Sequence, residues 1–255
     1  MQQGQSTPVV SAGHRCYSCS KGSGEGLKFN DMSRKKRAFA VIGLGTFGRQ
    51  VATQLADLGN EVLGIDIDER KVNPIADRLD QAVIADARDE QALKEAGLGD
   101  CDVALVAIGE DLEANILCTM TAQILGVPEV WVKAMNKMHH RILHRIGATR
   151  VIHPESEIGT HVAHMLHTPY MVDYVSLGNR SLVAIVSVPE ALQGQGVTDL
   201  DLEGYDIRCL GMVRGSDFVP CNGEADLAFR PGDRMLLLGR RDGLQRFATD
   251  LMDAG

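Results

Sequence analysis

Short apolar runs alternate with longer stretches of helical spacing between positions 38 and 152. The runs that predict strands are 38–42, 61–66, 81–85, 102–107, 129–133 and 150–152. The stretches that predict helices are 46–58, 69–77, 89–96, 111–125 and 137–145, and glycines stand near the ends of four of them. This alternation is typical of βαβ units. The sequence therefore predicts an α/β fold with a Rossmann-like, doubly wound parallel sheet.

The pattern changes after position 153. Pro154 stands in the first turn of a helix predicted at 154–168, where proline is favoured. Strands are then predicted at 172–177, 181–188, 206–213 and 234–239, with a turn at 215–217 and a short helix at 241–252. We expect this second part to be a small α+β domain. The expected division is a disordered leader or tag at 1–36, a first domain at 37–153, a crossover helix at 154–170 and a second domain at 171–255.

A glycine motif follows the first predicted strand. Gly43, Gly45 and Gly48 form Gly-x-Gly-x-x-Gly, with Thr46 and Phe47 between the last two glycines. In a Rossmann unit the first glycine makes a tight turn, the second lets a phosphate approach the backbone, and the third lets the helix pack on the strand. The motif therefore predicts a phosphate group at the N-terminus of the first helix.

Asp66 closes the second predicted strand, 18 residues beyond Gly48. A carboxylate at this position accepts hydrogen bonds from the ribose hydroxyls of an adenosine and repels a 2′-phosphate, which disfavours NADP. The competing interpretation is that the glycines only shape a turn and that Asp66 only caps a strand. The strand directly before the motif and the helix directly after it favour a bound adenosine.

Three further residues end predicted strands. Asp86 ends the third, Gly109 the fourth and Lys133 the fifth, so all three should lie along the crevice at the carboxyl edge of the sheet. Asp86 would accept a hydrogen bond from an adenine amino group, or alternatively act as the N-cap of the helix near Asp89. Lys133 would pair with a phosphate, or alternatively remain a solvated lysine.

Composition excludes several classes of function. The net charge of −8 disfavours nucleic acid and anionic lipid as partners. No run approaches the ~20 apolar residues of a membrane-spanning helix. The six cysteines are scattered through a chain of 255 residues, which favours reduced thiols. Cys16 and Cys19 have the spacing of half a zinc site, but no second pair stands nearby.

Several segments together resemble the RCK (regulator of potassium conductance) family, in particular its KtrA/TrkA type of cytosolic subunit. The resemblance covers 37–253. The segments that carry it are 39–48, 62–66, 106–109, 131–134, 146–148, 152–155 and 229–239. The resemblance implies an RCK_N nucleotide-binding domain, a crossover helix and an RCK_C domain. These should coincide with the three ranges expected after residue 36.

The resemblance also implies a regulatory protein rather than an enzyme. Members of the family bind ATP, ADP or NAD(H) and change shape with the ligand, so that a membrane potassium channel or transporter opens or closes. The implied assembly is a homodimer that builds an octameric ring beneath a potassium-translocating membrane subunit of the KtrB/TrkH type. The implied location is the cytoplasm, at the inner face of the cell membrane through that partner.

Two positions in the resemblance concern the ligand. Thr46 stands where KtrA-type proteins usually carry an arginine that reaches the terminal phosphate across the dimer, and this departure disfavours ATP-specific activation. Glu155 matches a position where facing carboxylates of a dimer hold a divalent cation, calcium or magnesium. The alternative role of Glu155 is to favour the helix dipole from the first turn of its helix.

A nicotinamide-dependent oxidoreductase is the rival class, because it uses the same glycine motif. Such an enzyme needs a proton-transfer group opposite the nicotinamide, and no His or Lys occurs from residue 171 to the end. The histidines do not alter this interpretation. Two sets of histidines have the spacing of one helix face, a spacing that metal ligands also use: His140 and His144, and His161, His164 and His167. No carboxylate or cysteine in a fixed position completes a metal site with either set. We expect solvated or interface histidines.

Overall fold

The computed structural model describes residues 36–221 and 228–253. The chain divides into two units, Met1–Lys36 and Arg37–Gly255, and every helix and strand of the described residues belongs to the second unit. All of the predicted leader except Lys36 lies outside the described residues, and so do Cys16 and Cys19. No described helix combines the length and the apolar character that crossing a bilayer requires.

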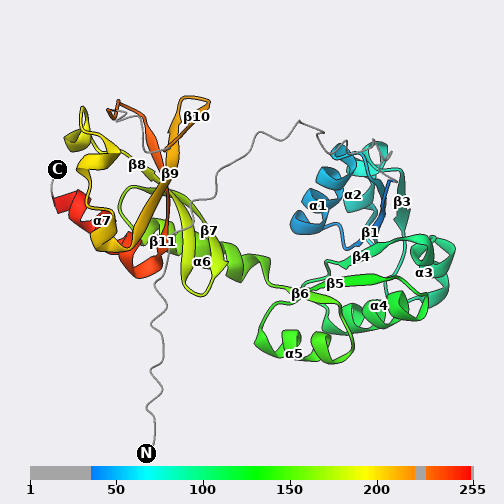
Figure 1. Ribbon diagram of the computed structural model, residues 1–255. Helices are drawn as coiled ribbons and strands as arrows, with labels where there is room; N and C mark the ends of the chain where they lie inside the picture. The colour runs from blue at the N-terminus through cyan, green and yellow to red at the C-terminus, as the bar shows by residue number, and fades with distance from the viewer. Residues whose placement is uncertain (1–35, 222–227, 254–255) are drawn as a thin grey trace, which may run out of the picture. The chain divides into compact units, whose positions relative to one another are not determined.

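Six parallel strands form the first sheet, in the order β3-β2-β1-β4-β5-β6 (Figure 1). Its elements are β1 (Ala38–Ile42), α1 (Thr46–Asp57), β2 (Glu61–Asp66), α2 (Glu69–Val72), β3 (Gln81–Ile84), α3 (Glu90–Glu95), β4 (Val103–Val106), α4 (Leu112–Ile124), β5 (Glu129–Lys133), α5 (Lys137–Arg145) and β6 (Arg150–Ile152), with short 3₁₀ helices at Asn73–Arg78 and Leu98–Asp100. The strand order reverses direction between β1 and β4, which is the topological switch point of this fold. The predicted doubly wound parallel sheet is confirmed.

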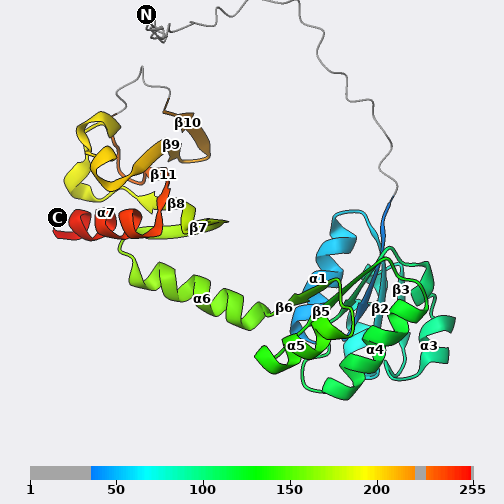
Figure 2. The same ribbon diagram turned by 60° about the horizontal axis from the view of Figure 1, so that its bottom comes forward.

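Alternation along the central strands places apolar side chains on both faces of this sheet. Ala40 and Ile42 of β1 belong to an apolar cluster with residues of α3, α4 and α5, whereas Val41 belongs to a cluster with residues of α1 and α2 (Figure 2). All four residues of β4 are buried. Burial on both faces removes apolar surface from water on each side, and the near-continuous apolar runs of the sequence reflect it.

The predicted helix at 69–77 is in fact two elements. The α-helix α2 ends at Val72, and a 3₁₀ helix with Pro74 in its first turn follows it. Proline has no N–H to donate to the carbonyl four residues earlier, and its ring clashes with that carbonyl, so the α-helix stops before it. The strands predicted at 81–85 and 102–107 are one and two residues shorter in the structure.

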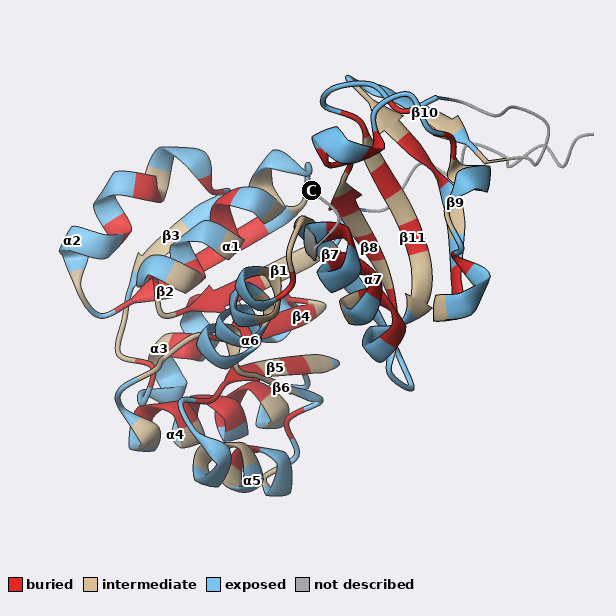
Figure 3. Cartoon of the chain, turned by 90° about the vertical axis from the view of Figure 1, so that its left-hand side faces the viewer, coloured by how far each residue is buried: buried red, intermediate tan, exposed pale blue. Residues whose placement is uncertain are grey.

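A second sheet has five antiparallel strands in the order β10-β9-β11-β8-β7. The elements of this part are α6 (Pro154–His167), β7 (Met171–Gly178), β8 (Ser181–Ser187), β9 (Ile207–Arg214), β10 (Asp217–Pro220), β11 (Arg234–Arg240) and α7 (Arg241–Asp253), with 3₁₀ helices at Glu190–Leu192, Val197–Asp199 and Glu203–Tyr205. Leu244, Phe247 and Leu251 of α7 pack on an apolar cluster with residues of β8, β9 and β11. Buried residues, red in Figure 3, run along the inner strands of both sheets.

Strand β10 is absent from the sequence-based prediction. The turn expected at 215–217 is shorter, because Asp217 already pairs with Arg214 across the β9–β10 hairpin. The strand has four residues, ends in Pro220 and pairs only with β9. Proline and aspartate are depleted in strands, and proline is tolerated mainly at sheet edges, so Phe218 and Val219 alone give too short an apolar run to predict a strand.

Candidate functional site

A cavity of about 810 Å³ lies at the carboxyl ends of the parallel strands. Its walls come from the segments that follow β1, β2, β3, β4 and β5, together with the first turn of α6. All ten residues that the sequence singled out line it: Gly43, Gly45, Thr46, Phe47, Gly48, Asp66, Asp86, Gly109, Lys133 and Glu155. This volume lies within the range of about 300–1,000 Å³ that is typical of small-molecule binding pockets.

The glycine motif forms the tight turn between β1 and α1. Gly43 has φ of +95°, and a Cβ atom there would lie 3.0 Å from the Ala107 carbonyl carbon. A Cβ atom on Gly48 would lie 1.9 Å from the Gly43 oxygen, so only glycine lets α1 start so close to the turn. Gly45 differs, because a Cβ atom there would meet nothing within 4 Å. Gly45 is also one of the residues that line the cavity.

The N-terminus of α1 favours an anion at this point. Gly45 is its N-cap and provides no side-chain hydrogen bond, and the first turn contains no acidic residue. The first N–H groups of a helix have no partner within the helix, and the helix dipole adds partial positive charge there. Thr46, the first helical residue, is exposed and lines the cavity, whereas Arg49 does not line it.

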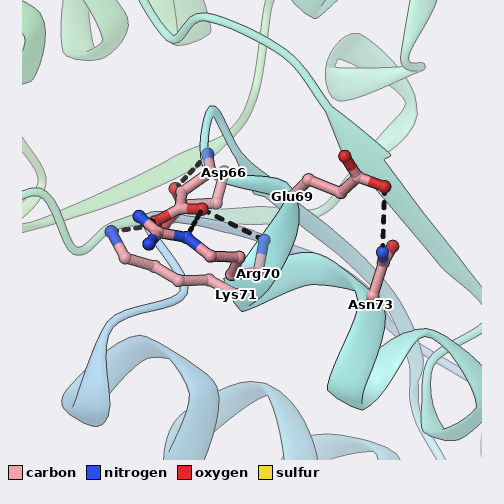
Figure 4. A network of polar contacts seen from close by, with 6 residues as sticks. Asp66, Glu69, Arg70, Lys71 and Asn73 are labelled. Atoms are coloured by element: carbon pink, nitrogen blue, oxygen red, sulfur yellow. Dashed lines mark hydrogen bonds and ion pairs between the residues drawn. The ribbon is translucent and has the colours of Figure 1, made fainter.

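Asp66 is 7% exposed, and its carboxylate accepts hydrogen bonds from backbone N–H groups of the neighbouring loops (Figure 4). Its Oδ2 atom accepts a hydrogen bond of 2.7 Å from the N–H of Leu44, and its Oδ1 atom accepts one of 2.9 Å from the N–H of Asp68. The ammonium group of Lys71 lies 3.5 Å from Oδ2. Each carboxylate oxygen can accept more than one hydrogen bond, so these contacts leave acceptor capacity toward the cavity. The carboxylate thus orients the glycine turn as well as lining the cavity.

Lys71 also lines the cavity, and sequence analysis did not identify it. It stands on α2, five residues beyond Asp66. Figure 4 shows Lys71 and Arg70 beside Asp66, while Glu69 and Asn73 form a separate contact. Arg70 pairs with Asp68 at 3.0 Å rather than with Asp66. The position of Lys71, in the first turn of the helix that follows the acidic strand end at Asp66, could have identified it from the sequence.

Asp86 forms a two-pronged ion pair with Arg88, whose guanidinium nitrogens donate to both carboxylate oxygens at 2.7–3.1 Å. This hydrogen bonding lowers the pKa of Asp86 below its usual value. Arg88 lines the cavity and was missed by sequence analysis. The alternative interpretation of Asp86 as an N-cap is wrong. The N-cap of α3 is Asp89, which directly precedes the first helical residue and accepts from the N–H groups of Gln91 and Ala92.

Lys133 closes β5 and is 9% exposed. Its ammonium group donates to Oε1 of Glu155 at 2.5 Å, and this bond lowers the pKa of Glu155. The same nitrogen lies 5.7 Å from the centre of the Phe47 ring. A Cβ atom on Gly109 would lie 3.7 Å from it. The structure therefore joins a predicted phosphate-binding residue to a predicted metal ligand.

The histidines contact other side chains rather than forming one cluster. His140 lies 3.0 Å from His153, measured between ring nitrogens, and stacks on His144 with ring centres 6.4 Å apart. The second set contacts β7 and α7: His161 pairs with Asp173, His164 with Tyr174 and Arg241, and His167 with Gln245. Burial, reinforced by the charge of Arg241, lowers the pKa of His164. Within 36–221 and 228–253, no three His, Cys, Asp or Glu side chains group as metal ligands would.

Comparison with known proteins gives a consistent result. The family model of the TrkA-N domain matches residues 39–154. The Ktr system potassium uptake protein C of Bacillus subtilis (strain 168) is 38% identical over 214 residues, which are 83% of this chain and 96% of that protein. The Ktr system potassium uptake protein A of the same organism is 33% identical over 219 residues, which are 86% of this chain and 98% of that protein.

A solved structure extends the likeness to the fold of both sheets. The crystal structure of the GsuK RCK domain is similar with a TM-score of 0.58 at 11% sequence identity. The similarity covers 84% of this chain and 48% of that one. At this identity the likeness shows the fold alone.

Proposed function

Because the chain belongs to the KtrA/TrkA type of RCK (regulator of potassium conductance) protein, we propose that it is a cytoplasmic regulatory subunit that binds an adenine nucleotide and gates a membrane potassium channel or transporter. The observation that carries nucleotide binding is the cavity of about 810 Å³ at the switch point, where the glycine turn, the open N-terminus of α1 and the buried carboxylate of Asp66 meet. The glycine turn and the N-terminus of α1 favour an anion, and the carboxylate of Asp66 favours ribose hydroxyls.

The proposed ligand is ATP, ADP or NAD(H). Its phosphates would approach the backbone at Gly45, Asp66 would accept from the ribose hydroxyls, and Asp86 would accept from the adenine amino group. Arg88 holds both oxygens of Asp86, so the adenine must share that carboxylate with the guanidinium group. Lys71 lies beside Asp66, so its positive charge would offset the negative charge of that carboxylate where the ribose binds.

We further propose that Lys133 pairs with a phosphate of the nucleotide and that Glu155 binds a divalent cation, calcium or magnesium, shared with a second subunit. In the single chain these two side chains neutralise each other. A phosphate arriving at Lys133 would compete with Glu155, and a cation arriving at Glu155 would compete with Lys133. Phosphate and cation are therefore expected to bind together, because each releases the residue that the other needs.

The proposed consequence of binding is allosteric. A homodimer, built into an octameric ring, would exist in two arrangements with different nucleotide affinities, and the difference in binding free energy would bias a KtrB/TrkH-type membrane subunit. The two Bacillus relatives, named as parts of a potassium uptake system, support this choice of partner. The absence of His and Lys from residue 171 onward supports binding rather than turnover.

The test replaces Gly45 by alanine. A Cβ atom there meets nothing within 4 Å, so the fold should persist while the methyl group occupies space that a phosphate needs. The control is Gly159→Ala in α6, where a Cβ atom also meets nothing within 4 Å and which does not line the cavity. We expect Gly45→Ala to weaken ATP, ADP and NADH in calorimetric titrations while Gly159→Ala binds as the wild type does.

Two further measurements complete this test. Mass spectrometry of the nucleotide that the purified protein retains identifies the ligand. Sustained oxidation of NADH with a small carbonyl substrate, abolished by Gly45→Ala, would replace the regulatory function by that of an oxidoreductase. Equal affinities of the wild type and Gly45→Ala for every nucleotide would instead contradict the placement of the phosphates.

A further inference from the structure

Two cysteine sulfurs lie next to each other at the edge of the second sheet. The Sγ atoms of Cys209 and Cys221 are 3.1 Å apart, although 12 positions separate the residues in the sequence. Cys209 belongs to β9, and Cys221 directly follows β10. The antiparallel register pairs Pro220 with Gly211, and the N–H of Cys221 donates to the carbonyl of Leu210 at 3.3 Å. The hairpin ladder therefore holds the two thiols together.

The other two described cysteines have a different environment. Cys101 and Cys118 are 6% and 0% exposed and belong to the apolar core of the first sheet. Burial raises the pKa of Cys101 to about 11 and that of Cys118 to about 12. Both are free thiols, and Cys101 contacts the carbonyl of Gly97 at 3.9 Å. Cys209 and Cys221 are only partly buried, so a reagent can reach the pair.

We propose that Cys209 and Cys221 form a reversible dithiol–disulfide site that takes small disulfides as its oxidising substrate. One of the two thiols loses its proton, and its thiolate attacks one sulfur of the small disulfide, which breaks that S–S bond and releases one small thiolate. The second cysteine then loses its proton and attacks the protein sulfur of the mixed disulfide. The second small thiolate leaves, so two protein thiols are oxidised to one disulfide and the small disulfide is reduced to two thiols.

The contact between the two sulfurs favours the second step. Whichever cysteine carries the small thiol, the other sulfur lies next to it and can displace that thiol. Burial and the neighbouring Cys221 sulfur raise the pKa of Cys209.

The cross-link would act on the weakest strand of the sheet. β10 has four residues and pairs only with β9, so its backbone hydrogen bonds are among the first to open. In addition, the register of β9 against β11 shifts between Gly211 and Cys209. A disulfide between Cys209 and Cys221 ties β10 to β9 beside this irregularity. Oxidation should therefore slow hydrogen exchange in β10 and leave the first sheet unchanged.

The experiment treats the full chain with glutathione disulfide, blocks free thiols with iodoacetamide and digests the protein with trypsin. Cleavage after Arg208, Arg214 and Arg234 puts the two cysteines on separate peptides, 209–214 and 215–234. We expect these peptides as one disulfide-linked pair, two hydrogens lighter than their sum, which disappears after excess dithiothreitol. Cys16 and Cys19 share the peptide 16–21, so a bond between them is distinguishable. Blocked, unlinked Cys209 and Cys221 at every glutathione ratio would overturn the proposal.

Single variants test the second step between the two cysteines. Cys209→Ser and Cys221→Ser should each lose the linked peptide pair, and glutathione on the remaining cysteine should not be released without dithiothreitol. Release of that glutathione at the wild-type rate would overturn the proposal. Cys101→Ser is the matched control and should still form the linked pair. Cys118, which is 0% exposed, should stay unmodified before digestion in every protein that remains folded.

Discussion

The ammonium group of Lys133 donates a hydrogen bond of 2.5 Å to Oε1 of Glu155, from the end of β5 to the first turn of α6. The side chain of Lys133 is 11% exposed, whereas that of Glu155 is 63% exposed. The buried lysine therefore depends on an accessible carboxylate for its counter-charge. Because the folded pKa of Glu155 is lowered, the pair is present near neutral pH and is lost as the pH falls through that pKa.

Glu155→Gln tests the proposed cation site. Two facing carboxylates of the proposed dimer would repel each other unless a cation neutralised them, so dimerisation of the wild type should strengthen with calcium or magnesium. Glu155→Gln should abolish that dependence in sedimentation velocity. Glu157→Gln is the control, because Glu157 stands in the same first turn but does not line the cavity. The same metal response in all three proteins would favour a helix-dipole role for Glu155.

Asp66→Ala should weaken all adenosine ligands to a similar extent, because they share the ribose. Hydrogen bonds to a charged group contribute about 1.5–3 kcal/mol, which corresponds to roughly ten- to a hundredfold in affinity. The substitution also removes the acceptor of the Leu44 N–H group, so the thermal unfolding midpoint should fall. Calorimetry and thermal unfolding measure the two effects.

Asp68→Asn is the control for Asp66→Ala. Asp68 is two residues away and accepts from the N–H of Arg70 through Oδ1, an atom that asparagine retains. It does not line the cavity. Unchanged nucleotide affinity in Asp66→Ala, with the control also unchanged, would show that the ribose lies elsewhere.

Thr46→Arg should raise the affinity for ATP relative to ADP by on the order of ten- to a hundredfold, since arginine adds a charged donor worth about 1.5–3 kcal/mol. In the wild type, ADP and NAD(H) should compete with ATP on nearly equal terms. Titration of ATP, ADP, AMP and NADH at one salt concentration measures the preference. Arg49→Ala is the control, because Arg49 does not line the cavity. A hundredfold preference of the wild type for ATP over ADP would show that another residue reads the terminal phosphate.

Arg214→Met should destabilise the second sheet. Arg214 donates to both oxygens of Asp233 at 2.6 and 2.9 Å, and Asp233 is 2% exposed. Without Arg214 the Asp233 carboxylate stays buried and lacks its counter-charge, so the free energy of unfolding should fall by more than it does when an exposed pair is lost. Urea unfolding near neutral pH measures this loss. Arg78→Met removes an exposed pair with Asp57 and should cost no more than about 1 kcal/mol.

The destabilisation by Arg214→Met should depend on pH. Arg214 lowers the pKa of Asp233 below the usual value of 3.8, so the stabilisation is fully present above that value and is lost as the pH falls through the lowered folded pKa. The difference between wild type and variant should therefore narrow in acid. A difference that stays constant from neutral pH into that range would show that the variant loses packing rather than an ion pair.

The sequence by itself determined the parallel sheet and the place of the site. β1, β2, β5 and β6 have the predicted bounds, because apolar runs between helical stretches are a local property of the chain. The glycine motif directly follows β1, and Asp66 is the last residue of β2. Ligands of this fold bind outside the carboxyl ends of the strands, so both features indicated the position of the cavity. The division at 37–153, 154–170 and 171–255 and the roles of the ten cavity residues stay predictions.

Only the tertiary structure decided which side chains meet. The pairing of Lys133 with Glu155 and of Cys209 with Cys221 joins residues 22 and 12 positions apart, and no local period encodes such contacts. Arg88 lines the cavity from the loop after β3, and its pairing with Asp86 is a contact that strand patterns do not predict. Strand β10 forms despite its proline because β9 offers a free edge to pair with. Local pattern determines the elements, whereas long-range packing and pairing determine the partners of each charged or reactive group.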